Sequence, residues 1–232
     1  MAETEGADVE LLTIGDRGSN RQVQALLDNV FPSPPSWTHT VVAGDIASGL
    51  ARISVERQAS MLLIGMKPGS QRHTTVEFAR SANLPVLAVP TQMSEPPRRV
   101  LMALDFSQSS VRAAKVAFHL LARPARAFMV SASAGSVGED PEPHIGLLFD
   151  TVENLLGAPR DVAITRHVVA GETPAALLRV AQSQLVDLIA VGRCGRSAAT
   201  CGKPGAMGRV ARAVVTSASC GVLLVPPPHL LQ

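Results

Sequence analysis

Two stretches of the chain share one pattern of apolar and polar positions. Residues 41–65 (VVAGDIASGLARISVERQASMLLIG) align without a gap with residues 168–192 (VVAGETPAALLRVAQSQLVDLIAVG). Each begins with a short β-branched run, continues with apolar residues at helical spacing, and ends in a uniformly apolar run. Each is followed by another apolar run before a proline, PVLAVP at 85–90 and GVLLVP at 221–226. The pattern predicts an internal repeat.

The alternation of these runs predicts parallel sheets. A short, uniformly apolar run indicates a strand covered on both faces, and strands that alternate with helices form βαβ units. Right-handed crossovers between such units then give a doubly wound sheet. In the second half, further strands are predicted at 100–104 and 125–133, and helices at 108–122 and about 142–157. The second half is therefore expected to contain five strands and four helices.

The first half is predicted to be a shortened copy of the second. Its opening apolar run, VELLTIGD at 9–16, is followed by a predicted helix near 21–30. Far fewer residues then lie before Val41 than lie between Asp105 and Val168 in the second half. About one strand–helix unit is missing. The spacing favours loss of the second unit, although loss of the first would fit almost as well.

A short linker is predicted to divide the two halves. Residues 91–97 (TQMSEPP) are polar and rich in proline, as linkers between domains often are. We therefore predict a shortened, degenerate domain over residues 1–90 and a complete domain over residues 98–232. The predicted fold class is α/β, with two tandem, open, doubly wound parallel sheets, of which the second has five strands.

Composition narrows the class of protein. Apolar residues make up 46% of the chain and charged residues 17%, which excludes a disordered protein, and the formal net charge of +2 suggests no nucleic-acid partner. No apolar run approaches the ~20 residues of a transmembrane helix, and the acidic N-terminus is unlike a signal peptide. The three cysteines suggest no disulfide framework, and neither they nor the histidines show metal-ligand spacing. We expect a cytoplasmic protein without a metal site or a membrane contact.

Four motifs of the second half resemble those of the universal stress protein family. They are VLMALDFS at 100–107, VVAGETPA at 168–175, DLIAVGRCGRS at 187–197 and CGVLLVP at 220–226. Each motif alone is weak, but the set in this order is fairly specific. The resemblance covers the second half and, more faintly, residues 38–90. It implies a five-stranded parallel sheet with helices on both faces, in a tandem protein whose halves pair as an intrachain pseudo-dimer or between chains as a homodimer.

The resemblance also implies a nucleotide site. In family members that bind ATP, the Asp that ends the first strand contacts the nucleoside, and a loop of the form G-x2-G-x9-G-(S/T) holds the phosphates. Asp105 and Gly192-Arg193-Cys194-Gly195 match the first parts of this pattern. Its end falls on Gly205-Ala206 by spacing, or on Gly208-Arg209 by alignment back from Cys220, and neither pair has the hydroxyl. The candidate nucleotide-binding residues are Ala103, Asp105, Val130, Gly192, Arg193, Gly195, Arg196, Gly205, Gly208 and Arg209.

The length of one segment argues independently for a site in the second half. In an open parallel sheet, ligands bind beyond the carboxyl ends of the strands, and a glycine-rich loop before a helix brings N–H groups to phosphates. The segment between Gly192 and Val222 is nine residues longer than the matching segment between Gly65 and Val86. The second copy therefore accommodates something that the first does not. The expected cofactor is ATP, with or without magnesium. The basic residues that can pair with its phosphates are Arg193, Arg196, Lys203 and Arg209.

Each of these residues also has a purely structural interpretation. Asp105 can cap the helix at 108–122, Gly192 and Gly195 can form a tight turn, and the arginines can form a solvated surface. Arg209 can also fill the pocket and exclude the ligand.

Two functions of different classes follow. The first is a cytoplasmic stress-response protein that binds ATP or a related adenine nucleotide as a sensor or regulator. Any hydrolysis by such a protein would be slow, because the sequence offers no evident base to orient water. The alternative is a dimerisation or protein-interaction module that binds no nucleotide. An enzyme of a related class, such as a nucleotidyl transferase, is disfavoured because a second catalytic motif is lacking.

Overall fold

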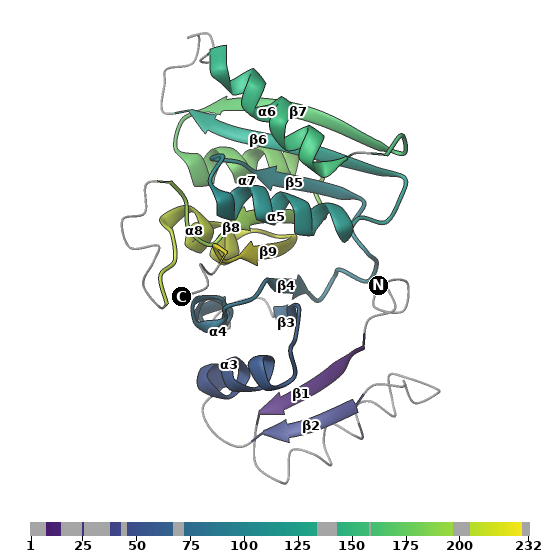
Figure 1. The fold of residues 1–232 in the computed structure, drawn as a ribbon, viewed down its shortest axis with the longest axis vertical. Coiled ribbons are helices and arrows are strands. Elements are labelled where there is room, and N and C mark those ends of the chain that lie inside the picture. The colour runs from purple at the N-terminus through teal and green to yellow at the C-terminus, as the bar shows by residue number, and fades with distance from the viewer. Residues whose placement is uncertain are drawn as a thin grey trace. The chain divides into compact units, whose positions relative to one another are not determined.

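The structure is a computed structural model that describes residues 8–14, 25, 38–42, 46–66, 72–133, 143–157, 159–196 and 205–228 (Figure 1). The chain divides into two compact units, Met1–Gln58 and Ala59–Gln232. Most of the helix predicted near residues 21–30 lies outside the described residues.

The first unit contains two paired strands and a helix. Strands β1 (Glu10–Ile14) and β2 (Thr38–Val42) pair in parallel, with Glu10 opposite Thr38. The hydroxyl of Thr40 donates a hydrogen bond of 2.6 Å to the Glu10 carboxylate. Helix α3 (Ile46–Glu56) follows β2, as the sequence predicts.

The second unit is built on one seven-stranded sheet with the order β3-β4-β9-β8-β5-β6-β7. The pairs are parallel except that between β4 and β9. The five strands predicted for the second half, β5 to β9, occur in the doubly wound order β9-β8-β5-β6-β7, so this prediction is confirmed. The strands are β3 (Leu62–Met66), β4 (Val86–Pro90), β5 (Arg99–Ala103), β6 (Ala125–Ser133), β7 (Val162–Ala170), β8 (Leu188–Gly192) and β9 (Gly221–Val225).

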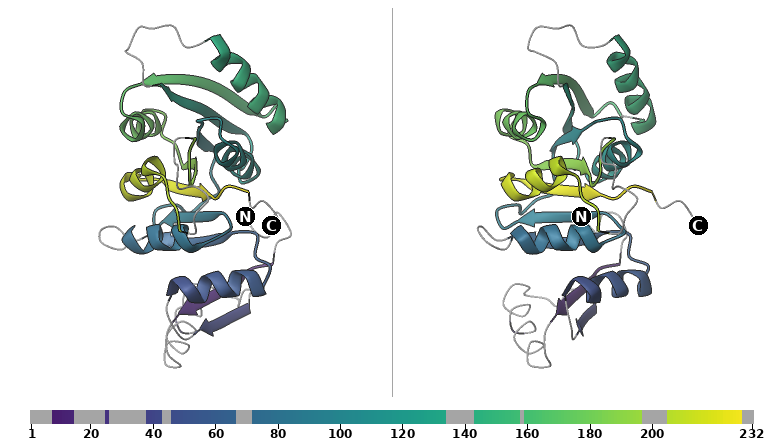
Figure 2. Two further views of the ribbon diagram at one scale, coloured as in Figure 1. Left: turned by 60° about the vertical axis from the view of Figure 1, so that its left-hand side comes forward. Right: turned by 90° about the vertical axis from the view of Figure 1, so that its left-hand side faces the viewer.

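Helices cover both faces of this sheet, and each face has its own apolar core (Figure 2). On one face, α5 (Gln108–His119) packs small side chains such as Ala113 and Ala117 against the strands, beside α6 (Pro143–Leu156). The other core is formed with α4 (Arg72–Ser81), α7 (Thr173–Ser183) and α8 (Arg209–Ser217). Burial on both faces explains why the central strands carry uniformly apolar sequences.

The antiparallel pair joins corresponding strands of the two repeats. Alignment of PVLAVP (85–90) with GVLLVP (221–226) makes Leu87 of β4 the counterpart of Leu223 of β9. These two leucines lie opposite each other, and Val86 and Ala88 lie opposite Leu224 and Val222. The register is therefore symmetric about the Leu87–Leu223 pair, as a local two-fold relation requires.

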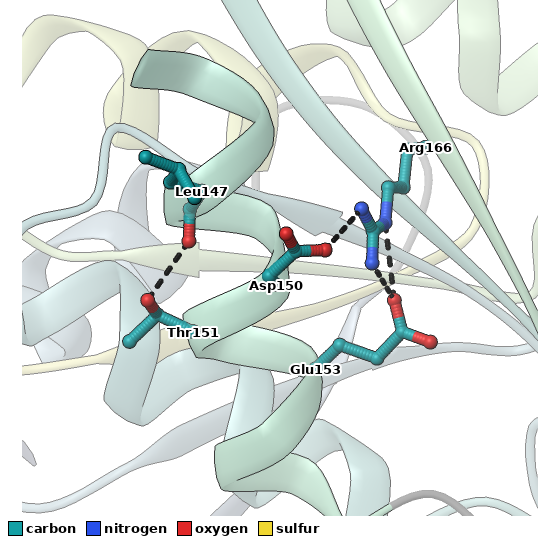
Figure 3. Close-up of polar contacts among 5 residues, drawn as sticks. All are labelled: Leu147, Asp150, Thr151, Glu153 and Arg166. Atoms are coloured by element: carbon teal, nitrogen blue, oxygen red, sulfur yellow. Dashed lines mark hydrogen bonds and ion pairs between the residues drawn. The ribbon is translucent and has the colours of Figure 1, made fainter.

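A small ion-pair network lies at the outer edge of the sheet. Arg166 of β7 donates a hydrogen bond of 2.7 Å to the carboxylate of Asp150 and also pairs with Glu153, both on α6 (Figure 3). All three side chains are exposed to a third or more, so solvent screens the interaction and its contribution to stability is small.

Candidate functional site

The candidate site lies where two central strands end. Strands β5 and β8 are parallel neighbours, with Ala103 opposite Val191. After β5 the chain crosses to β6 through α5, and it returns from β7 to β8 through α7 on the opposite face of the sheet. The strand order therefore reverses between β5 and β8, and this is the point at which open α/β sheets bind ligands.

Asp105, two residues after β5, joins the start of α5 to the loop after β8. One of its carboxylate oxygens accepts hydrogen bonds from the backbone N–H of Ser107 at 3.1 Å and from the Ser107 hydroxyl at 2.6 Å. The other oxygen accepts the backbone N–H of Arg196 at 2.7 Å. The N-cap of α5 is Ser107, whose side chain accepts the N–H of Ser110, so Asp105 supports the cap instead of forming it.

These hydrogen bonds keep Asp105 ionised. Partial burial alone would raise the pKa of its carboxyl, because it penalises the charged form. Hydrogen bonds from Ser107, from the Arg196 backbone and from Ser110 stabilise the charged form and together leave the pKa below its ordinary value. The site therefore presents a fixed negative charge at neutral pH.

Gly192 and Gly195 allow the loop to approach its neighbours closely. A Cβ atom on Gly192 would lie 2.8 Å from the backbone N of Ser110 and 2.9 Å from the carbonyl carbon of Ser109. A Cβ atom on Gly195 would lie 2.5 Å from the Asp105 carboxylate. Both glycines are thus required by packing of the loop against α5 and Asp105, which brings the loop backbone to the strand ends.

The candidate arginines have different environments. Arg193 is only 5% exposed, and its guanidinium donates hydrogen bonds to carbonyl groups at the end of α4. Arg209 is exposed and forms an ion pair of 2.5 Å with Glu172. Arg196 is exposed and is bound to Asp105 through its backbone. The structure therefore leaves Arg196 next to Asp105, whereas Arg193 and Arg209 engage other protein groups. Lys203 lies outside the described residues.

The two candidates for the last glycine of the G-x2-G-x9-G-(S/T) pattern are Gly205 and Gly208, and both lie near the start of α8. Gly205 has a left-handed backbone (φ +72°), and its carbonyl oxygen accepts a hydrogen bond from Arg80. Gly208 is the N-cap of α8, and its N–H donates to the Arg193 carbonyl at 2.7 Å. Among the described residues, no side chain caps the first turn of α8, so backbone N–H groups there can donate hydrogen bonds to an anion.

The remaining candidates form the buried floor of the site. Ala103 ends β5 and is 8% exposed, and Val130 lies opposite it on β6 and is fully buried. The carbonyl of Val130 accepts the N–H of Leu104 at 2.8 Å. Neither side chain offers a polar group, so these residues shape the site instead of binding charge.

The cysteines of the described region are shielded. Cys194 is buried in the loop, with its sulfur 3.7 Å from the carbonyl oxygen of Ala206. Burial raises the pKa of the Cys220 thiol to about 11, which leaves it protonated at neutral pH. Reactive thiol chemistry therefore has no support at either residue.

Sequence reasoning missed two residues of the site, Arg80 and Glu172. Neither had a local signal, because their partners Gly205 and Arg209 are distant in sequence. The sequence does predict a helix cap at residues 107–110, and Ser107 is the N-cap of α5.

The described residues contain neither a cluster of metal-binding side chains nor a membrane-spanning helix. No group of three or more His, Cys, Asp or Glu side chains is placed to hold a metal ion. No helix in that part of the chain is long and apolar enough to cross a membrane.

Comparison with known proteins agrees with the fold. The sequence model of the universal stress protein family matches residues 97–226. A putative universal stress protein from Pseudomonas aeruginosa UCBPP-PA14 gives a TM-score of 0.68 at 17% identity and covers 97% of this chain and 85% of its own. A universal stress protein from Archaeoglobus fulgidus DSM 4304 gives a TM-score of 0.64 at 17% identity, and the match covers 97% of this chain and 88% of that one. No curated protein matches the sequence.

Shorter structures match a single half. One is a universal stress protein in complex with cAMP, with a TM-score of 0.45 at 19% identity, over 58% of this chain and 100% of that one. The long matches span both repeats at low identity, so they show the tandem fold.

Proposed function

This chain belongs to the universal stress protein family, and we propose that its second half binds ATP or a related adenine nucleotide. The protein would act in the cytoplasm as a stress-response sensor or regulator, with nucleotide occupancy as the signal. The observation that carries this proposal is the Asp105–Arg196 hydrogen bond, which joins an ionised carboxylate to the glycine-rich loop at the switch point of the sheet.

The residues of the site divide into two groups that suit the two parts of a nucleotide. The Asp105 carboxylate accepts hydrogen bonds, as a nucleoside hydroxyl requires. The loop backbone, the first turn of α8 and the exposed Arg196 supply donors and positive charge, as phosphates require. Magnesium would enter with the phosphates.

We infer that the contact between Asp105 and the Arg196 N–H is exchanged on binding. Ser107, Ser110 and Arg196 together already supply four donors to the carboxylate, which has about four acceptor positions. A nucleoside hydroxyl at Asp105 would replace the Arg196 N–H, which would then be available to a phosphate oxygen. The rearrangement would change the loop between Gly192 and Gly208, and that change is the proposed signal.

The first repeat is proposed to hold no second site. Gly192 and Gly195 form a G-x2-G pair in the second repeat, whereas the matching residues 65–75 (GMKPGSQRHTT) of the first repeat lack such a pair. The symmetric pairing of β4 with β9 supports an intrachain pseudo-dimer, in which the first repeat is the partner of the binding repeat.

Calorimetric titration of ATP with magnesium tests the proposal. The unmodified protein should bind about one ATP per chain. Gly195→Val should abolish binding, because even a Cβ at this position would meet the Asp105 carboxylate at 2.5 Å. Asp105→Ala should weaken or abolish it. Gly146→Ala on α6 is the matched control, because a Cβ there meets nothing within 4 Å, and it should bind as the unmodified protein does.

Absence of binding would refute the nucleotide proposal. No heat and no rise in melting temperature up to millimolar ATP would leave the protein-interaction module as the function to pursue. Equal binding by the unmodified protein and by a folded Gly195→Val variant would place the nucleotide elsewhere.

A further inference from the structure

The loop after β8 is bound to a helix of the other repeat at its first end. The guanidinium of Arg193 donates hydrogen bonds to the carbonyl oxygens of Ala79, at 3.2 Å, and of Ala82. A third contact reaches the carbonyl of Arg80 at 3.4 Å. The last carbonyl groups of a helix have no partner within it, and the helix dipole is negative there. A buried guanidinium is therefore well placed to bind the end of α4.

The same turn of α4 binds the other end of the loop. The Nε atom of Arg80 donates a hydrogen bond of 3.0 Å to the carbonyl oxygen of Gly205. The left-handed backbone of Gly205 disfavours most other residues at this position. Residues 197–204 lie outside the described part of the chain, but the residues on both sides of them contact the final turn of α4.

The two ends of the loop also bind each other. The Gly208 N–H donates to the Arg193 carbonyl at 2.7 Å, and the Cys194 sulfur lies 3.7 Å from the Ala206 carbonyl oxygen. The Arg193 N–H in turn donates to Val225 of β9 at 2.7 Å. Arg193 thus connects the loop to β9 through its backbone and to α4 through its side chain.

We propose that α4 of the first repeat positions the loop of the second repeat, with Arg193 and Arg80 as the positioning residues. The proposal assigns a role to a repeat that lacks a site of its own, and it rests on the proposed nucleotide function only for the identity of the loop's ligand. Because coupling between sites is reciprocal, nucleotide bound to the loop would also stabilise the contact of the loop with α4.

Hydrogen–deuterium exchange of the full chain without nucleotide tests this positioning. Arg80 is exposed, so Arg80→Ala should fold. This variant loses the hydrogen bond from Arg80 to the Gly205 carbonyl oxygen. Hydrogen exchange at residues 193–196 and 205–208 should therefore become faster by several-fold to about tenfold, the range expected for one hydrogen bond. Exchange in β8 and β9 should not change. Arg80→Lys retains a donor and should restore slower exchange, and Arg179→Ala, an exposed arginine on α7, should leave the loop unchanged.

The same variants decide whether the positioned loop is the nucleotide loop. Arg80→Ala should weaken ATP binding about five- to tenfold, a usual size for coupling between sites, and Arg179→Ala should not. Unchanged loop exchange in Arg80→Ala, or equal effects of both variants, would overturn the inference. Faster exchange with unchanged ATP affinity would overturn the link to the nucleotide. If the unmodified protein binds no ATP, the proposed function fails and exchange alone decides the positioning.

Discussion

The ionisation of Asp105 should make the stability of the protein depend on pH. Hydrogen bonds to the Asp105 carboxylate hold its pKa in the folded chain below its ordinary value. Folding therefore favours the carboxylate, and this contribution is complete above the unfolded pKa and is lost as pH falls through the folded pKa. We expect the melting temperature of the unmodified protein to fall more steeply below about pH 4 than that of Asp105→Asn. The other carboxyl groups are common to both proteins, so parallel curves would contradict the assignment.

Single residues differ in how far the sequence reveals them. Gly192 and Gly195 were identified from the loop pattern, which explains them by the approach of the loop backbone to a ligand. The structure adds a second reason, because Gly192 packs closely against α5 and Gly195 against Asp105. Arg193 was predicted to contact phosphate, whereas its side chain binds the end of α4. This contact joins residues more than a hundred positions apart, and no local pattern encodes it.

Helix α5 depends on the residue that precedes it. Ser107 caps its first turn and also donates to Asp105. Ser107→Ala should lower the free energy of unfolding by about 1 kcal/mol or somewhat more, because it removes a cap and a hydrogen bond to a charged group. Urea denaturation would measure the loss. Ser107→Thr keeps the hydroxyl and should recover most of it, and equal losses in the two variants would argue against the cap.

Elements were predicted best where both faces are buried. Strand β6 has the bounds that the sequence predicts, 125–133, and its central apolar residues 127–130 (AFMV) are buried. Of β7, only the VVAG part was predicted. Strand β7 lies at the edge of the sheet, and of its first five residues only Val162 is buried, while three, including Arg166, are exposed. These residues therefore lack the uniformly apolar signal.

The tandem organisation followed from the repeat, but the sheet of the second unit did not. Strands β3 and β4 join this sheet through the antiparallel contact of β4 with β9. The sequence shows that these two strands correspond, and it offers no signal for their pairing, because apolar strands of this kind can be covered by many partners.

The symmetric register of β4 and β9 can be tested with an engineered disulfide. Val86 and Leu224 lie directly opposite each other, and opposite residues of antiparallel strands have Cα atoms about 4.5–5.5 Å apart, within the range of a disulfide. Val86→Cys with Leu224→Cys should therefore oxidise to a disulfide within one chain, seen as a faster-moving monomer on a non-reducing gel. The diagonal pair Val86→Cys with Val222→Cys is the matched control and should cross-link poorly. A covalent dimer would show that the strands pair between chains, and preferential cross-linking of the diagonal pair would show a shifted register.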